Sequence, residues 1–554
     1  MSPLPARSKR RFLIPALLTL LITAGSLRIV ATYRVFSQTF DEAEHIHSGL
    51  AWLSGGSLKL LTESAPLPRI AAALPLYLKG VPYTGDFDFS TAVLDGSFQK
   101  RVARPLYYHN DYRNNLAWAR FGELPFFWAG CLGVFYWCRE LFGEAAALMA
   151  VLLFSNLPPV LAHAGLATLD MALAGVFIWA IYGFTRWLAA PGLRASLVLG
   201  AVLGITVLCK LSSLGFFPAA VALILFAALL ANSLRTLAWR RLFRQTVLVS
   251  IVALLTIWAG YRFSIGTIRT TKTGSEVMAG HGLRASLARQ VSRMTLPGSY
   301  FIEALGYAAV HVSGGHPTYF LGRTGTRGWW YFFPVALAVK TPLGFLLLAG
   351  LGIWLSLRLY WRKRSWVHAA PAASAAAILL VGMASPLDIG IRHMLPLYPM
   401  LAIAAGAAAV QLWNSNRRLA GRALAVLLTG WTVVSAARIH PDYIAYFNEL
   451  GGSHPENILV HSDLDWGQDL YRLCDRVRDL HIDALSIVYF GSADLARFPL
   501  HVTKHLTPED CARTTGWVAA SLMDLKTYPQ AFQWLDRQPY QTVGRSIRLY
   551  WIAP

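Results

Sequence analysis

Residues 12–437 form a ladder of apolar segments separated by short polar connections. Only 14% of the 554 residues are charged and 55% are hydrophobic, whereas soluble domains carry about 25% charged residues. Apolar segments of about 20 residues are long enough to cross a bilayer as helices. The pattern therefore predicts a polytopic α-helical membrane protein and excludes an ordinary soluble enzyme.

We predict about eleven transmembrane helices. The first follows a basic tail and has no small-residue cleavage site behind it, so we expect it to be retained as a membrane span. The spans are expected near residues 12–30, 119–137, 145–160, 171–187, 195–209, 213–232, 246–263, 340–357, 367–384, 393–412 and 422–437.

The basic residues predict the orientation of these spans. Lys and Arg are concentrated in alternate connections, which is typical of cytoplasmic loops. We therefore expect the N-terminus inside and the C-terminus outside. The net charge of +21 has the same origin, because the basic residues flank apolar spans and form no continuous face for nucleic acid.

Two long loops, 31–118 and 264–339, are expected on the outer side, within a membrane domain of residues 1–437. Ile46, Leu50 and Leu53 have helical spacing, which predicts a helix lying on the membrane surface just after Asp41. The aromatic run at 329–333 is typical of the headgroup zone.

Residues 438–554 differ in character from the rest of the chain. Short β-rich runs at 485–490, 517–522 and 546–552 alternate with polar helical stretches such as 468–480. This pattern predicts a small extracytoplasmic α/β domain. Cys474 and Cys511 lie in it, and either pair there or remain two buried thiols.

Lone charges at the outer ends of the spans indicate a site. A charge at a bilayer boundary is costly unless it has a partner or a function. Unrelated interfacial ion pairs are the alternative reading of any single residue. Together the residues suit group transfer from a lipid-linked phosphate, because cations stabilise a departing phosphate and a carboxylate deprotonates an incoming hydroxyl. These residues are Asp41, Glu42, Asp170, Arg120, Lys210, Lys340 and Arg392.

A metal is a separate question. The adjacent carboxylates Asp41 and Glu42, with Glu44, His45 and His47 nearby, also suit a divalent cation. Carboxylates together with substrate phosphate often hold such an ion, but nothing in the pattern demands one. We expect no required cofactor and keep a divalent cation as the alternative.

Several motifs carry a family resemblance. Asp41-Glu42 after the first span resembles the first-loop acidic pair of membrane GT-C glycosyltransferases, which use polyprenyl-phosphate sugars and include family-39 protein O-mannosyltransferases and aminoarabinose transferases of lipid A. LAHAGLATLDMALA (161–174) resembles their second acidic motif. Further stretches resemble bacterial phospholipid-carrier-dependent glycosyltransferases: LCKLSSL (208–214), GWWYFFPVALAVKTPL (328–343), GIRHMLPLYP (390–399), HPDYIAYFNELGG (440–452) and SDLDWGQDL (462–470).

The resemblance implies a GT-C architecture, an inverting reaction and a role for each site residue. Asp41 would be the catalytic base, Glu42 would support it, and Asp170 would complete the acidic site. Lys210, Lys340, Arg392 and, less directly, Arg120 would hold the carrier phosphate. One departure is Ala65-Pro66-Leu67-Pro68-Arg69, which stands where the family has a His-Pro-Pro-Leu-like stretch.

The sequence therefore predicts a glycosyltransferase in a bacterial inner membrane, with its active site on the periplasmic side. It would move a sugar from a polyprenyl phosphate to a glycolipid, a glycan or a protein hydroxyl. A secondary transporter is the first alternative, although its site would lie near the midplane between repeated halves. The second is a non-catalytic lipid-binding or assembly protein.

Two other patterns have ordinary explanations. Asp463, Asp465, Gly467 and Asp469 mimic part of a calcium loop but lack the closing Glu, so a helix cap and turn is expected there. The alternative is that this segment covers the site or contacts the acceptor. His311, His316 and His393 are isolated in the sequence, and we expect interfacial hydrogen bonding for each.

Overall fold

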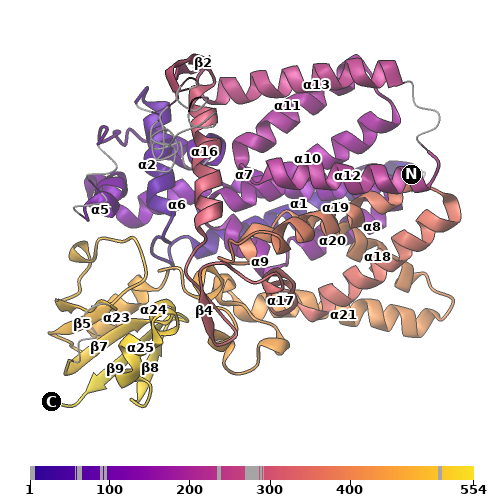
Figure 1. Ribbon diagram of the computed structural model, residues 1–554. Helices are drawn as coiled ribbons and strands as arrows, with labels where there is room; N and C mark the ends of the chain where they lie inside the picture. Colours follow the sequence, from indigo (N-terminus) through magenta and orange to yellow (C-terminus); the bar gives the residue numbers. More distant parts are fainter. Residues whose placement is uncertain are drawn as a thin grey trace, which may run out of the picture.

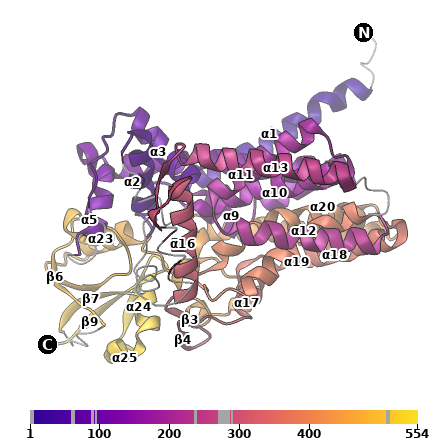
Figure 2. The same ribbon diagram turned by 45° about the horizontal axis from the view of Figure 1, so that its top comes forward.

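The computed structural model describes residues 6–56, 58, 65–87, 92, 96–233, 239–268, 286, 290, 292–508 and 514–554. Long helices lie side by side in a bundle, and the extramembrane parts of the chain gather at one end of it (Figure 1). The N-terminus lies at the opposite end from the C-terminal sheet in both views (Figure 2). The protein is thus a multi-pass helical membrane protein. We call the end of the bundle that carries the long loops and the C-terminal sheet the elaborated end.

Seven helices in the described part of the chain are long and apolar enough to cross a membrane. They are α1 (Ala6–Thr32), α10 (Leu169–Ala189), α12 (Ser213–Leu230), α13 (Trp239–Gly260), α18 (Leu343–Lys363), α19 (Trp366–Met383) and α21 (Arg418–Ile439).

The remaining predicted spans also coincide with helices. α7 (Leu124–Phe142) and two shorter apolar helices, α11 (Leu193–Cys209) and α20 (Leu397–Trp413), lie at three of these positions. The fourth is a bent pair, which would make an eighth crossing. The positions of the predicted helices are confirmed, while the count of eleven crossings and their orientation stay predictions.

The predicted span at 145–160 is broken. α8 (Glu144–Phe154) and α9 (Pro158–Ala164) meet at an angle of 67°. Proline lacks an N–H and disfavours helical geometry at the residue before it, so Pro158-Pro159 ends one helix and begins the next. The bend turns the chain toward the elaborated end of the bundle, just before Asp170.

Three charged residues that were expected at the outer ends of spans lie in short helices or turns that precede those spans. Arg120 belongs to the short helix α6 (Tyr112–Phe121), and the span α7 begins at Leu124. Lys340 ends α17 (Phe332–Lys340), and Pro342 caps the following span. Arg392 lies in the 3-10 turn η3 (Ile391–Met394) before α20. Apolarity alone did not reveal these short preceding turns.

The first outer loop folds on itself. α2 (Glu42–Leu53) crosses α3 (Pro66–Leu78) so closely that a Cβ at Gly49 would lie 1.9 Å from the Arg69 carbonyl oxygen. Ile46 and Leu50 are fully buried against protein. The helix after Asp41 was predicted correctly, but the prediction that it lies on the membrane surface was wrong. α5 (Phe98–Ala103) and η2 (Arg104–Asn110) complete the described loop.

The described part of the second long loop contains α16 (Ser299–Gly314) and two short pairs of antiparallel strands. Within the aromatic run, Trp330 is 67% exposed whereas Phe332 and Phe333 are 1% exposed. Only part of the run is therefore available to a headgroup zone, because its end packs into the protein core. β1 (Ile265–Thr267) pairs with β2 (Thr295–Pro297), and β3 (Thr318–Phe320) pairs with β4 (Arg323–Gly325).

The C-terminal part contains the predicted α/β fold. Its five-stranded sheet has the order β6-β5-β7-β9-β8, with parallel pairing around β5 and antiparallel pairing around β9. The amphipathic helix α23 (Leu470–Asp479) lies in the predicted helical stretch. The division of the chain at residue 437 stays a prediction. The strands are β5 (Leu485–Val488), β6 (Val502–His505), β7 (Gly516–Ser521), β8 (Tyr540–Val543) and β9 (Ile547–Ile552), and the short helices are α24 (Leu522–Thr527) and α25 (Pro529–Phe532).

The centre of the bundle is formed by α10 and α20. Every residue from 397 to 409 of α20 is buried, and small side chains let its neighbours approach closely. A Cβ at Gly352 of α18 would lie 1.9 Å from the carbonyl oxygen of Ala404. α10 is equally enclosed, so Asp170 in its first turn is held on a rigid support.

Candidate active site

A carboxylate and a guanidinium from distant parts of the chain meet at the elaborated end of the bundle. Asp41 is the N-cap residue of α2, and its Oδ2 accepts a hydrogen bond of 2.8 Å from Arg392 Nη1. The Asp41 side chain is 30% exposed and that of Arg392 is 9% exposed. The charged pair is therefore partly accessible, and its acidic member is the more exposed of the two.

Two more predicted residues extend this pair inward. Asp170 Oδ2 lies 3.8 Å from Arg392 Nη1, and Asp170 Oδ1 accepts a hydrogen bond of 2.6 Å from Lys210 Nζ. Asp170 is 2% exposed, and Lys210 is 17% exposed. Acids and cations thus alternate in a connected row: Asp41, Arg392, Asp170 and Lys210.

Burial and charge act on Asp41 in opposite directions. Burial raises the pKa of Asp41, but the Arg392 charge, His45 and the Arg392 hydrogen bond outweigh it and hold the pKa below its ordinary value. Asp41 is therefore an ionised, partly accessible carboxylate at neutral pH. Such a group can accept a proton.

Arg392 is supported by the C-terminal segment. Its guanidinium carbon lies 4.2 Å from the ring centroid of Trp466. Asp463 Oδ1 accepts the Ile391 N–H at 3.0 Å, and the Ser462 hydroxyl donates to the Ile389 carbonyl. These contacts fix the turn that presents Arg392.

Gly390 is required in this turn. Its φ of +130° is a conformation that L side chains rarely adopt. A Cβ there would also lie 2.3 Å from Ser462 Oγ.

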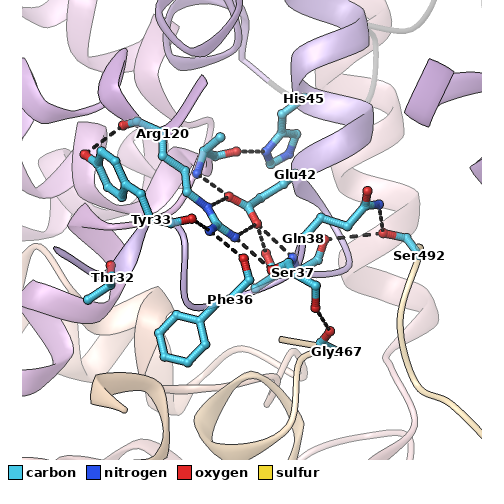
Figure 3. Close-up of polar contacts among 12 residues, drawn as sticks. Thr32, Tyr33, Phe36, Ser37, Gln38, Glu42, His45, Arg120, Gly467 and Ser492 are labelled. Atoms are coloured by element: carbon cyan, nitrogen blue, oxygen red, sulfur yellow. Dashed lines mark hydrogen bonds and ion pairs between the residues drawn. The ribbon is translucent and has the colours of Figure 1, made fainter. Parts of the chain in front are cut away.

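Glu42 lies in a closed polar network with Arg120 (Figure 3). Arg120 Nε and Nη2 donate to its two carboxylate oxygens at 2.8 Å each, and the Thr39 and Ala167 N–H groups also donate to it. Glu42 and Arg120 are both fully buried. Burial raises the pKa of Glu42, but Arg120 and the backbone N–H groups outweigh it and hold the pKa below its ordinary value.

The side chains of Arg120 and Lys340 both have hydrogen-bond partners within the protein. Arg120 also donates to the backbone carbonyls of Tyr33, Phe36 and Ser37, which tie the end of α1 to the start of α2. Lys340 is 2% exposed; its Nζ donates to the carbonyls of Ile444 and Asp463 and lies 4.1 Å from the Phe447 ring centroid. Both cations therefore hold backbone segments of the site together, and their expected contact with phosphate stays untested.

Arg69 and Glu123 were not predicted as site residues, and Glu44 and His45 were named only as possible metal ligands. Arg69 comes from the Ala65–Arg69 stretch; it pairs with Glu44 at 3.0 Å and is 1% exposed. Beside it, burial and Arg69 lower the pKa of His45 to about 4, and His45 Nδ1 donates to the Ala167 carbonyl at 3.1 Å. Glu123 is fully buried, with both carboxylate oxygens unpartnered in the described structure. The only sequence signal for Glu123 was its place three residues after Arg120.

The Asp463–Asp469 segment contains the turn and the helix cap that were expected. Gly467 has a φ of +86° and donates to Asp465 Oδ1 at 3.2 Å, which confirms the turn. The cap of α23 is Asp469, which accepts N–H bonds from Arg545 and Ser546. The described residues contain no group of three or more His, Cys, Asp or Glu able to hold a metal ion.

Two further expectations concern histidines and cysteines. His316 is not isolated, since its ring centroid lies 5.1 Å from that of His461, and His393 belongs to the η3 turn beside Arg392. Cys474 is a buried thiol. Cys511 lies outside the described residues, so the predicted alternatives for this pair stay open.

No family model and no curated protein sequence matches the chain. Among solved structures the chain is similar to ArnT from Cupriavidus metallidurans bound to undecaprenyl phosphate, with 13% identity, a TM-score of 0.49, and coverage of 96% of this chain and 97% of that chain. It is also similar to the apo oligosaccharyltransferase of Archaeoglobus fulgidus, with 15% identity, a TM-score of 0.45, and coverage of 77% and 55%. Both similarities lie at low sequence identity.

Proposed function

We propose that the protein is an inverting glycosyltransferase of GT-C architecture that moves one sugar from a polyprenyl phosphate to an acceptor. The observation that carries this proposal is the row of Asp41, Arg392, Asp170 and Lys210 at the elaborated end of the bundle. It combines an accessible ionised carboxylate with two cations at one boundary of the membrane bundle. We further propose that this end faces the periplasm of a bacterial inner membrane.

The reaction needs a base and a stabilised leaving group. The acceptor oxygen attacks the anomeric carbon, and its proton passes to Asp41. The bond between the anomeric carbon and the phosphate oxygen breaks, and its electron pair stays on the departing polyprenyl phosphate. The sugar is transferred from the carrier to the acceptor in a single displacement, which inverts the anomeric configuration.

Lys210 and Arg392 are the residues we assign to the departing phosphate. The phosphate gains one negative charge when the bond breaks, so cations beside it stabilise the transition state more than the ground state. Lys210 is partly exposed and has one carboxylate partner, which leaves N–H donors for a ligand. Asp170 lies between both cations and holds them in place before the donor arrives.

Glu42 and Arg120 have positioning roles in this scheme. Their ion pair fixes residues 33–42, the segment that presents Asp41. Because Arg120, Thr39 and Ala167 already occupy the Glu42 oxygens, the chemistry we propose uses no resident metal or cofactor. A divalent cation that enters with the donor phosphate is the alternative, and it would rest on Asp41.

Asp41→Asn tests the proposal. A transferase should lose turnover by about 10²–10⁴-fold, the range for removal of a general base, while it still binds the lipid carrier. The assay measures release of polyprenyl phosphate from lipid-linked sugars extracted from the native membranes. Asp483→Asn, an exposed carboxylate of the C-terminal part, is the matched control. Full activity of Asp41→Asn would point to a lipid-binding or assembly protein instead.

The acceptor class follows from the position of the site. A site at a membrane boundary suits a membrane-bound acceptor, so we favour a glycolipid over a soluble glycan or a protein hydroxyl. Mass spectrometry of the envelope glycans from a deletion strain would show which glycan lacks one sugar.

A further inference from the structure

A second cleft lies beside the site, between the first outer loop and the C-terminal part. Its volume is about 880 Å³. Residues 107–114 of η2 and α6 form one wall, and α23 with residues 496–499 forms the other. Figure 1 shows these parts of the chain gathered at the same end of the molecule. Neither the proposed chemistry nor the sequence motifs account for this cleft.

The floor of the cleft is aromatic. Tyr112, Tyr471 and Phe498 are buried and contact one another edge to face, with centroid distances of 5.5 Å (Tyr112–Phe498) and 6.0 Å (Tyr112–Tyr471). Tyr107 stacks on Tyr112 at 4.8 Å. The ring faces are covered by one another and by nearby guanidinium groups, so the rings form a rigid base whose polar tips suit the hydroxyl groups of a sugar.

The rim of the cleft is cationic. Asp111 is paired with Lys79 at 2.8 Å, and Asp475 is paired with Arg478 at 2.9 Å. Arg34 and Arg113 have no carboxylate within 4.0 Å in the described part of the chain, and they face the same cleft. A surplus of positive charge therefore remains at the rim, and it favours an anionic ligand.

Two of the guanidinium groups contact aromatic rings. Arg113 lies 4.0 Å from the Tyr471 ring centroid, and Arg497 lies 4.9 Å from that of Tyr107. Contact with a ring restricts the guanidinium group, and its N–H donors suit phosphate or carboxylate oxygens. The cleft thus combines groups that suit the hydroxyls of a sugar with groups that suit an anion.

The floor of the cleft is bonded to the segment that carries Asp41. The Gln38 N–H donates to Tyr112 Oη at 3.1 Å, and Gln38 Nε2 donates to Ser492 at 2.8 Å, the second of which is drawn in Figure 3. Gln38 precedes Asp41 by three residues. A ligand held in the cleft would therefore lie over the segment that presents the proposed base.

We infer that this cleft binds an anionic saccharide, the phosphate- or carboxylate-bearing sugar part of the acceptor. The identification of this ligand as the acceptor rests on the proposed function, whereas binding of the saccharide can be measured without turnover. The saccharide could be the headgroup of a glycolipid or part of a free glycan, since the recognising chemistry is the same.

The first experiment measures binding directly. Full-length protein in octaethylene glycol monododecyl ether, a detergent without sugar, is titrated calorimetrically with phosphorylated pentamannose and with the same oligosaccharide after phosphatase treatment. We expect the phosphorylated form to bind at least tenfold more tightly. The double variant Arg113→Gln/Arg497→Gln should lose about tenfold or more in affinity, as expected for loss of charge-assisted hydrogen bonds.

The controls separate this inference from the proposed function. Arg358→Gln removes an exposed arginine that stacks on Trp354 outside the cleft, and it should leave the affinity unchanged. Asp41→Asn should also bind normally even though turnover is lost. Equal affinity of the wild type and the double variant, or equal affinity for the neutral oligosaccharide, would overturn the inference whatever the turnover assay shows.

A second arm identifies the source of the saccharide. The protein is reconstituted in nanodiscs of neutral lipid, with or without the glycolipid fraction of its native membranes, and the titration is repeated. Competition by the glycolipid fraction assigns the cleft to a lipid headgroup, whereas unchanged titration assigns it to a free glycan. In a turnover assay, the double variant should raise KM for the acceptor and leave kcat within about twofold.

Discussion

Arg120 and Glu42 form a two-pronged ion pair with no solvent exposure, across 78 residues of sequence. Both oxygens of the carboxylate are used, and the remaining guanidinium donors hold the backbone carbonyls of residues 33, 36 and 37. The pair joins the end of α1, the start of α2 and the end of α6. It therefore sets the position of Asp41, which is adjacent to Glu42.

Arg120→Leu should be strongly destabilising. It leaves the Glu42 carboxylate buried without a counter-charge, which costs about 3–5 kcal/mol, whereas Arg120→Leu combined with Glu42→Gln should recover part of the loss. Thermal unfolding in detergent measures the effect. The control is Arg186→Leu, whose contact with Glu140 is 3.8 Å long and largely exposed, and it should cost less than about 1 kcal/mol. Similar losses for both variants would contradict the structural importance of the pair.

Asp41 should remain ionised through the neutral range. Because Arg392 holds its pKa low against burial, the transferase rate should fall only when acid protonates this base. In Arg392→Gln the pKa of Asp41 rises, so the acidic limb of the pH–rate profile should move to higher pH. Lys210→Gln keeps the Asp41–Arg392 pair and should leave the midpoint of that limb in place. An unmoved limb in Arg392→Gln would mean that Asp41 is not the titrating base.

Lys210 and Lys340 should respond differently to substitution. Lys210 is partly exposed, so Lys210→Gln should weaken carrier-phosphate binding by about tenfold, through loss of a charge-assisted contact, with little change in melting temperature. Lys340 is buried on two carbonyls, so Lys340→Met should lower the melting temperature first, because both carbonyls lose their donor. Binding of polyprenyl phosphate and thermal unfolding are measured on both variants. If Lys340→Met instead weakens carrier binding and Lys210→Gln instead lowers the melting temperature, Lys340 would be assigned to the carrier phosphate.

Glu123→Met should stabilise the protein. A buried carboxyl without hydrogen-bond partners in the described structure costs free energy, and a similarly sized apolar side chain removes that cost. We expect a gain of about 1 kcal/mol in thermal unfolding. Glu144→Met, at an exposed position in the first turn of α8, serves as control. It should lower the stability slightly, since an acid at that position complements the helix dipole. A marked loss of stability in Glu123→Met would show that this carboxyl has a partner in the folded protein.

The apolar pattern was sufficient to locate the helices. Each predicted span coincides with a helix, because burial of apolar segments in a bilayer is decided by local composition. Asp170 was predicted at the head of a span because the apolar run begins just after it, and it lies in the first turn of α10. The short β-rich runs likewise located β5, β7 and β9 of the C-terminal sheet, but not the edge strands β6 and β8.

Local apolarity could not show how the ends of the spans are built. The break at Pro158, the separate helix α6 and the end of α17 at Lys340 all lie within apolar or mixed segments. Their geometry depends on which neighbours pack against them. The helix at 42–53 is another example. Its sequence is compatible with an apolar face on lipid or on protein, and only the structure shows that α3 packs against it.

By itself, the sequence determined the membrane class, the helix positions and the set of charged residues at one end of the bundle. Only the tertiary structure decided how those charges are paired: Asp41 with Arg392, Asp170 with Lys210, and Glu42 with Arg120. Asp41 and Glu42 are neighbours in the chain, yet successive helical side chains diverge by about 100°, so one is partly exposed and the other is enclosed. Apolar burial is a local property of composition, whereas an ion pair depends on distances through space between segments remote in sequence.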